Sequence, residues 1–196
     1  MSRTTYEILE IIYALKRHKH TIYGVGLLFL VSFIVSYLLI YIDIWHFREI
    51  GNIIFSQFSE SVDASHITNK SSLDIFLFIL IHNLSVAFLI YLTMILSIII
   101  LMTNAFLIAY VIYATEPLKF VLLVIPHGII EIPALILSAS SGILLFKAFC
   151  KKIKKSSEYI IDYRDSLRIF IASIILFTIA AIVESTVTFG IARMIN

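Results

Sequence analysis

The sequence predicts an all-α membrane protein, a polytopic bundle of about five transmembrane helices that forms one domain over residues 1–196. Of its 196 residues, 60% are hydrophobic and 14% are charged, whereas soluble domains carry roughly a quarter charged residues. Several uncharged runs also have the length that a helix needs to cross a ~30 Å hydrocarbon core. These observations exclude a soluble globular protein. The net charge of +2 is too small to indicate a nucleic-acid partner.

The uncharged runs define the individual spans. The run at 75–115 contains no Asp, Glu, Lys or Arg. As one helix it would reach about 60 Å, twice the hydrocarbon core, so it must hold two spans with a reversal, which length alone places at 91–97. The five predicted spans cover about residues 22–42, 74–92, 95–115, 126–149 and 169–192.

The first twenty residues predict an amphipathic helix. Ile8, Ile11, Ile12 and Leu15 follow helical spacing, and residues 16–20 are basic. Such a helix could lie on the membrane surface, or it could pack on the bundle as a short cap. The pattern favours neither alternative.

A broken, re-entrant segment is predicted at residues 118–133. Pro126 lacks a backbone donor and suits the first turn of a helix, so a short half-helix should end before it and a new helix should begin there, close to Gly128. Pro133 frees the carbonyl of Ile129 and should bend the new helix. Broken backbone at membrane depth is tolerated only where protein or a wet cavity covers it, so we expect this segment to face inward.

Ionisable and amide side chains occur within these spans. His127 and Glu131 are four residues apart and therefore lie on one helix face, one turn apart. Because a charge in the bilayer centre costs roughly 3 kcal/mol on insertion scales, such residues indicate a functional site. The predicted intramembrane polar site comprises His127, Glu131, Glu184, Asn83, Asn104 and His82.

Three interpretations of this site remain open from the residues alone. A buried polar network could fix the register of the bundle and perform no chemistry. The carboxylates could mark a path for protons or ions, as in a transporter or channel. Finally, His127, Glu131 and Glu184 could hold a divalent metal, as in an intramembrane metal-dependent hydrolase, although no His-Glu-x-x-His motif is present. No catalytic residue and no cofactor is predicted, so an enzyme is disfavoured.

The distribution of charge predicts the orientation in the cell membrane. The N-terminal segment and residues 147–168 are basic and should be cytoplasmic, whereas residues 43–74 are mainly acidic and should lie outside. Three predicted crossings separate the last two segments, so the count and the charges agree. The N-terminus should then be cytoplasmic and the C-terminus outside. Small residues along the first span permit a homo-oligomer without requiring one.

The sequence Pro-His-Gly-Ile-Ile-Glu-Ile-Pro-Ala at 126–134 resembles the PHG-x-x-E-x-P-A signature of the stage II sporulation protein M family. Residues 103–106 and 182–188, together with Asn83, resemble further family features, and the similarity covers about residues 75–190. The chain departs from the pattern in having few glycines. The resemblance implies a multi-pass protein without established enzymatic activity, whose partners are the lipid bilayer and other membrane proteins. The expected function is thus a non-catalytic component of a membrane complex.

Overall fold

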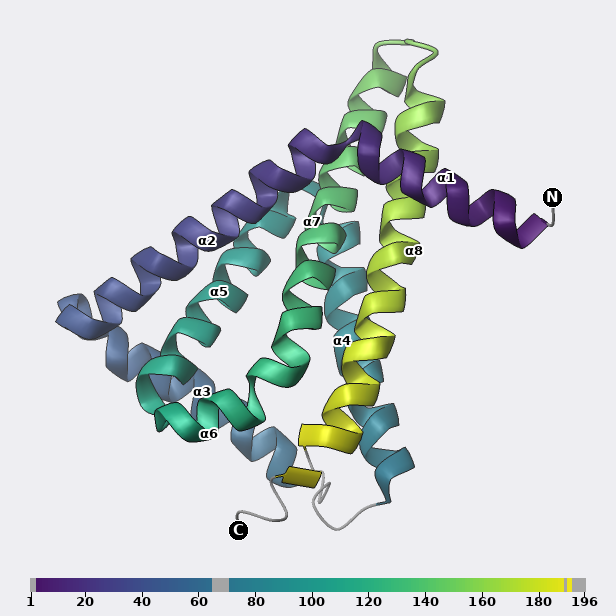
Figure 1. Cartoon of the computed structure of the whole chain (residues 1–196). Helices are drawn as coiled ribbons and strands as arrows, with labels where there is room; N and C mark the ends of the chain where they lie inside the picture. Colours follow the sequence, from purple (N-terminus) through teal and green to yellow (C-terminus); the bar gives the residue numbers. More distant parts are fainter. Residues whose placement is uncertain (1–2, 65–70, 189, 192–196) are drawn as a thin grey trace.

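The computed structural model describes residues 3–64, 71–188 and 190–191. Over these residues the secondary structure consists of helices, without strands, which confirms the all-α class (Figure 1). Three short helical turns, η1 (Ile44–His46), η3 (Met94–Leu96) and η4 (Glu184–Thr188), join or extend the longer helices. The α-helices are α1 (Arg3–Arg17), α2 (Lys19–Ile42), α3 (Phe47–Ala64), α4 (Ser72–Leu92), α5 (Ser97–Ala114), α6 (Pro117–Leu123), α7 (Ile125–Ile153) and α8 (Tyr159–Val183).

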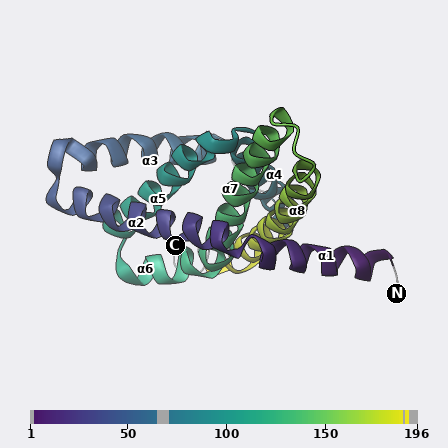
Figure 2. The ribbon, with the colours of Figure 1, turned by 90° about the horizontal axis from the view of Figure 1, so that it is seen from above.

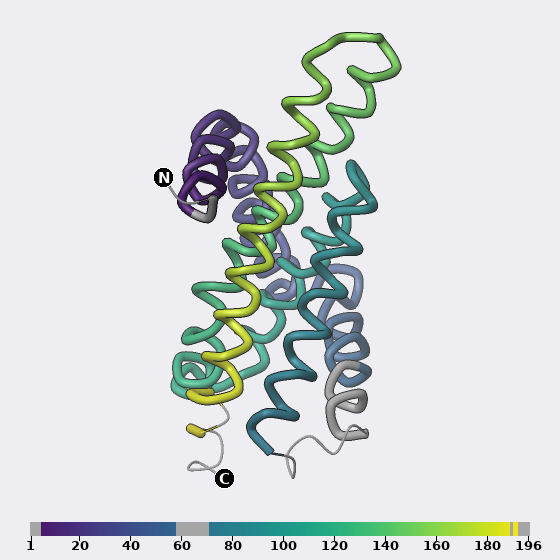
Figure 3. Tube along the Cα trace, turned by 90° about the vertical axis from the view of Figure 1, so that its right-hand side faces the viewer, coloured from purple at the N-terminus to yellow at the C-terminus, as the bar shows by residue number. Residues whose placement is uncertain are grey.

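Five segments of the described chain are long and apolar enough to cross a membrane, as predicted: α2, α4, η3 with α5, α7, and α8 with η4. All five contribute side chains to one hydrophobic core, and the views from above and from the side show how they are grouped (Figures 2 and 3). In Figure 2, α2, α3 and α5 lie on one side, and α4, α7 and α8 lie on the other. The predicted end of the last span, residue 192, lies outside the described residues.

The reversal inside the uncharged run occurs within the predicted window. Helix α4 ends at Leu92, and the turn η3 leads directly into α5. No glycine is available there, and Met94 instead adopts a left-handed backbone conformation with φ of 54°. A non-glycine residue is uncommon in this conformation, which explains why no turn residue marked the site in the sequence.

The helices extend beyond the last two predicted spans at the basic end of the bundle. Helix α7 continues to Ile153 and α8 begins at Tyr159, so the basic segment at 147–168 consists mostly of helix and contains the tip of a helical hairpin. Ion pairs explain the extension: Lys151 Nζ lies 3.0 Å from Glu158 and 2.9 Å from Asp162. With 29 residues, α7 is about 43 Å long, more than the ~30 Å core, so the hairpin projects beyond the bilayer.

Helix α1 packs on the bundle, which is the second of the two predicted arrangements. It runs across α8 below the tip of the hairpin (Figures 1 and 3). Ala14 is buried, and Glu10 forms a 2.8 Å ion pair with Arg168 of α8. The side chains of Ile8 and Tyr13 are nevertheless about half exposed, at 54% and 55%. The helix is therefore attached to the bundle by one face and keeps an apolar face available to a membrane surface.

Small side chains allow α7 to approach its neighbours closely. Ser138 donates a 2.9 Å hydrogen bond to the carbonyl of Ala87 on α4, and Ser166 of α8 donates a 2.8 Å bond to the carbonyl of Ser141 on α7. At Gly142, an added Cβ would lie 3.0 Å from the carbonyl oxygen of Ile90. Close packing of small residues and hydrogen bonds between helices are the main sources of helix association in membranes.

We therefore expect Gly142→Ala to destabilise the bundle by about 1–3 kcal/mol, because its methyl group meets backbone that cannot rotate away. The matched control is Gly24→Ala, where an added Cβ meets no atom within 4 Å. Alanine there should be neutral or stabilising, since it is the better helix former. Thermal unfolding of both variants in detergent measures the difference. Equal midpoints would show that the close contact at Gly142 contributes nothing.

Candidate functional site

The helix break occurs where the prolines predicted it. Helix α6 ends at Leu123, α7 begins at Ile125, and Pro126 occupies its first turn. An added Cβ at Gly128 would meet no atom within 4 Å, so packing does not require glycine there. Pro133 is exposed, which differs from the expected inward direction. The break lies at the end of the bundle that also holds α3, opposite the hairpin (Figure 1).

His127, in the first turns of α7, reaches the end of α8. Its Nδ1 lies 3.3 Å from Oγ1 of Thr188, a buried residue in η4. The turn η4 is π-helical, a wider turn that occurs often at functional sites. The other two hydroxyl groups of η4 bond within their own helix, since Ser185 and Thr186 both donate to the carbonyl of Ile182. Thr188 belongs to the segment 182–188, which resembles a feature of the family named above. Its contact with His127 could not be predicted from the sequence, because the two residues are on different helices.

Glu131 and Glu184 form the second element of the site. Glu131 lies one turn beyond His127 on α7, and Glu184 begins η4. Both side chains are half-buried, and the two carboxyl groups interact electrostatically. Among the residues that the structure describes, neither carboxyl group has a hydrogen-bond donor or a cation. Two acidic groups from different spans thus lie near each other without a partner that compensates their charge.

The other polar residues of the predicted site do not join this pair. Asn83 is buried on α4, and its Nδ2 has no hydrogen-bond partner in the described part of the chain. Asn104 donates to the carbonyl of Ile100 in its own helix, at 2.8 Å. His82 is exposed on α4. The structure therefore brings together His127, Glu131 and Glu184 and leaves the two asparagines and His82 in separate environments.

The acidic pair lies away from the middle of the bundle. Lys147 of α7 contacts Thr21 at the start of α2, with Nζ and Oγ1 3.3 Å apart, and so marks the basic end of the bundle. Glu131 precedes Lys147 by sixteen residues, which corresponds to about 24 Å along the helix. In a core of ~30 Å, the pair is then closer to the end that holds α3 and α6.

Over the described residues, no three His, Cys, Asp or Glu side chains gather closely enough to hold a metal ion. A protein zinc site requires at least three such ligands. His127 bonds a threonine, and the two carboxyl groups lack a third ligand beside them. The metal centre that the sequence allowed for His127, Glu131 and Glu184 therefore has no support in this geometry.

A second polar cluster, at the basic end, was missed in the sequence. Asp165 is 1% exposed and accepts hydrogen bonds from Arg17 Nη1 at 2.7 Å and from His18 Nε2 at 3.0 Å. Arg168 Nη1 lies 3.5 Å from the other carboxyl oxygen of Asp165. This cluster attaches α1 to α8. Nothing in the sequence indicated it, because its members are about 150 residues apart and each belongs to an ordinary charged segment.

Thermal unfolding of variants distinguishes the acidic pair, Glu131 and Glu184, from the cluster around Asp165. We expect Glu131→Gln and Glu184→Gln to keep or raise the thermal midpoint, because neither carboxyl group has a donor to lose and an unpaired acidic group within a span is costly. Asp165→Asn should destabilise the protein by about 1–3 kcal/mol, below the range for a fully buried pair because the Arg17 side chain is half exposed. If Glu131→Gln lowers the midpoint as much as Asp165→Asn does, the acidic pair belongs to a structural network.

Comparison with known proteins identifies the family. The family model described as stage II sporulation protein M matches residues 25–189. An uncharacterised protein of Methanocaldococcus jannaschii, MJ0706, is 39% identical over 195 residues, covering 96% of this chain and 91% of its own. A second uncharacterised protein of that organism, MJ0793, is 38% identical over 81 residues, 39% of this chain and 46% of its own. No solved structure matches the chain significantly. The chain belongs to the stage II sporulation protein M family of multi-pass membrane proteins.

Proposed function

We propose that the protein is a non-catalytic subunit of a membrane protein complex. In this proposal a partner membrane protein supplies a basic or hydrogen-bonding side chain to Glu131 and Glu184. The observation that carries the proposal is that these two carboxyl groups, placed on different spans, have no donor or cation among the described residues.

The energetics of membrane burial support a donor from outside the chain. An acidic group within a span is costly unless it is paired, and such residues normally face protein or water. A network that only fixed the register of the bundle would satisfy its own members, as the cluster around Asp165 does. Glu131 and Glu184 are half-buried, so neither residue is fully enclosed by the described part of the chain.

Transport is the main alternative, because two adjacent carboxyl groups could also accept protons or cations. Two hollows in the described structure do not contribute such a site. One lies between α1, α2 and α7, and the other is lined by residues of α2 and α5, and neither includes His127, Glu131 or Glu184. Neither of these two hollows therefore supplies a path to the acidic pair.

The orientation is part of the proposal. The hairpin tip carries Lys152, Lys154 and Lys155, and it projects from the same end of the bundle as α1 (Figure 1). By the positive-inside rule this end is cytoplasmic, and the end with α3, α6 and the acidic pair faces outward. The partner would then contact the protein near the outer surface of the membrane.

Accessible cysteines test the orientation. In a Cys150→Ser background, we introduce Gln57→Cys on α3 or Lys154→Cys on the hairpin, both at exposed positions. A membrane-impermeant maleimide should label intact cells that carry Gln57→Cys. It should label Lys154→Cys only after the cells are permeabilised. The reverse pattern would overturn the proposed orientation.

Purification from native membranes tests the complex. In mild detergent we expect the 22.3 kDa chain to elute with a second polypeptide in a fixed ratio. The double variant Glu131→Gln/Glu184→Gln should elute without it, because the partner's donor has lost its acceptor charge. Its thermal midpoint should be no lower than that of the wild-type chain alone. The matched control is Glu116→Gln, which removes an exposed carboxylate from the loop beside α6, where it pairs with Lys119 at 3.6 Å. This control should keep the partner.

Three results would contradict the proposal. In the first, the double variant retains the partner as the wild type does. In the second, the wild type elutes alone or as a multiple of its own mass. In the third, proteoliposomes that contain the wild type conduct protons or sodium ions and Glu131→Gln abolishes the flux, which would establish transport instead.

A further inference from the structure

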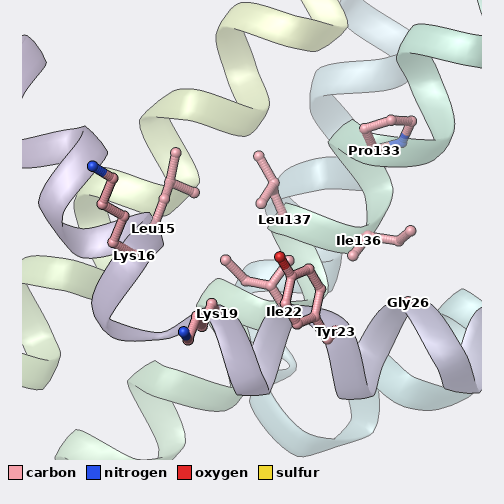
Figure 4. A pocket seen from close by; sticks show the side chains of 9 residues that line it. All are labelled: Leu15, Lys16, Lys19, Ile22, Tyr23, Gly26, Pro133, Ile136 and Leu137. Atoms are coloured by element: carbon pink, nitrogen blue, oxygen red, sulfur yellow. The ribbon is translucent and has the colours of Figure 1, made fainter.

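A cleft of about 640 Å³ lies between the end of α1, the first turns of α2, and α7 (Figure 4). Its volume is within the range of ligand sites, roughly 300–1,000 Å³. It does not include the acidic pair. The cleft is lined by Leu15, Lys16, Lys19, Ile22, Tyr23, Gly26, Pro133, Ile136 and Leu137.

The cleft has a charged end and an apolar body. Lys16 and Lys19 flank the junction between α1 and α2, whereas the wall on α7 consists of Pro133, Ile136 and Leu137 (Figure 4). Pro133 precedes Lys147, which marks the basic end, by fourteen residues, or about 21 Å along α7. The cleft thus leads from the basic end of the bundle deep into the hydrocarbon region.

The two lysines are available to an external anion. Both are exposed, and within the described chain neither has a hydrogen bond or an ion pair. Two acidic side chains at this end already have basic partners: Glu10 pairs with Arg168, and Asp165 pairs with Arg17. A ligand that fits this charge pattern carries a negative group at one end and a long apolar tail.

We propose that this cleft binds one anionic phospholipid. Its phosphate lies between Lys16 and Lys19, and an acyl chain lies along Ile22 and Gly26 against Leu137. The position agrees with the attraction of basic segments to anionic lipid headgroups at the cytoplasmic surface. Such a lipid would connect α1 and α2 to α7 at the place where α2 diverges from the bundle core (Figure 1).

Native mass spectrometry of the full chain in dodecyl maltoside tests this site, with dioleoyl phosphatidylglycerol and dioleoyl phosphatidylcholine as probes. One phosphatidylglycerol should be retained at concentrations where phosphatidylcholine is not. The variant Lys16→Ala/Lys19→Ala should bind it roughly 25-fold more weakly, because each lysine near an anionic surface contributes a factor of about five. The control Lys154→Ala/Lys155→Ala removes two lysines at the same end outside the cleft and should bind normally.

A second pair of variants tests the apolar body. At Gly26 an added Cβ would meet only Ile136, at 3.8 Å, so Gly26→Phe fits the backbone and places its ring in the cleft. It should abolish retention of the lipid. The control is Gly24→Phe, which should bind the lipid as the wild type does. Gly24 does not line the cleft, and an added Cβ there meets no atom within 4 Å. Thermal midpoints of all variants exclude misfolding as the cause, and the lysine variants decide the matter if Gly26→Phe does not fold.

Several outcomes would overturn the proposal. Equal retention of the two lipids, or unchanged binding by Lys16→Ala/Lys19→Ala, would show that the lysines do not select the headgroup. Displacement of the lipid by millimolar glycerol 3-phosphate would identify a soluble phosphate as the ligand. A wild-type dimer that Gly26→Phe converts to a monomer would show that a second copy of the chain covers this cleft.

Discussion

Close contact between α7 and its neighbours α4 and α8 determines where every other helix can lie. In a bilayer, lipid tails are as apolar as leucine, so helices associate through tight packing and hydrogen bonds rather than through exclusion of water. Gly142 permits backbone contact with the end of α4, and Ser138 and Ser166 donate across the helix interfaces. The stacked rings of Tyr91 and Phe170, with centroids 4.3 Å apart, fill the space beside this contact. Helices α1, α5 and α6 pack directly on these three, whereas α2 packs mainly on α5 and α3 packs on α2 and α5.

The length of α7 places the two polar clusters at opposite ends of the bundle. The cluster at one end has its hydrogen-bond partners, and the acidic pair at the other end does not. At the basic end, Asp165 receives donors from two side chains of the α1 end, and Lys151 pairs with two carboxylates. These contacts close the hairpin and hold α1 in place. At the other end, Glu131 and Glu184 approach each other without a donor among the described residues. The cluster around Asp165 has hydrogen-bond partners for its carboxylate, whereas the acidic pair has none in the described chain. Unpaired polar groups of this kind lower the stability of a protein and are typical of functional sites.

Sequence reasoning predicted what depends on composition and spacing, and it failed where distant side chains decide. The five spans, the reversal near Met94 and the helix start at Pro126 follow from run length and proline chemistry alone. The extension of α7 and α8 past their apolar stretches could not be predicted, because it depends on ion pairs such as Lys151 with Asp162. Likewise, Asn83 and Asn104 carry the same side chain. Only packing decides that Nδ2 of Asn83 is buried without an acceptor in the described chain, whereas Asn104 donates to a carbonyl of its own helix.

The position of α2 explains why the bundle has a cleft at all. Only 22% of the residues in the apolar stretch of α2 are buried, against 44% for α7. The reason is that α2 packs mainly on α5 and diverges from α7 (Figure 2). Two oblique helices touch over a short length, and beyond the contact between Lys147 and Thr21 the space between them must be filled by something apolar. Gly26 and Pro133 have small or compact side chains and leave this space open instead of closing it. The cleft thus combines an open apolar space with two lysines that lack partners in the described chain. An anionic lipid has a matching charged headgroup and apolar tail, and it fits the cleft better than a helix from another protein would.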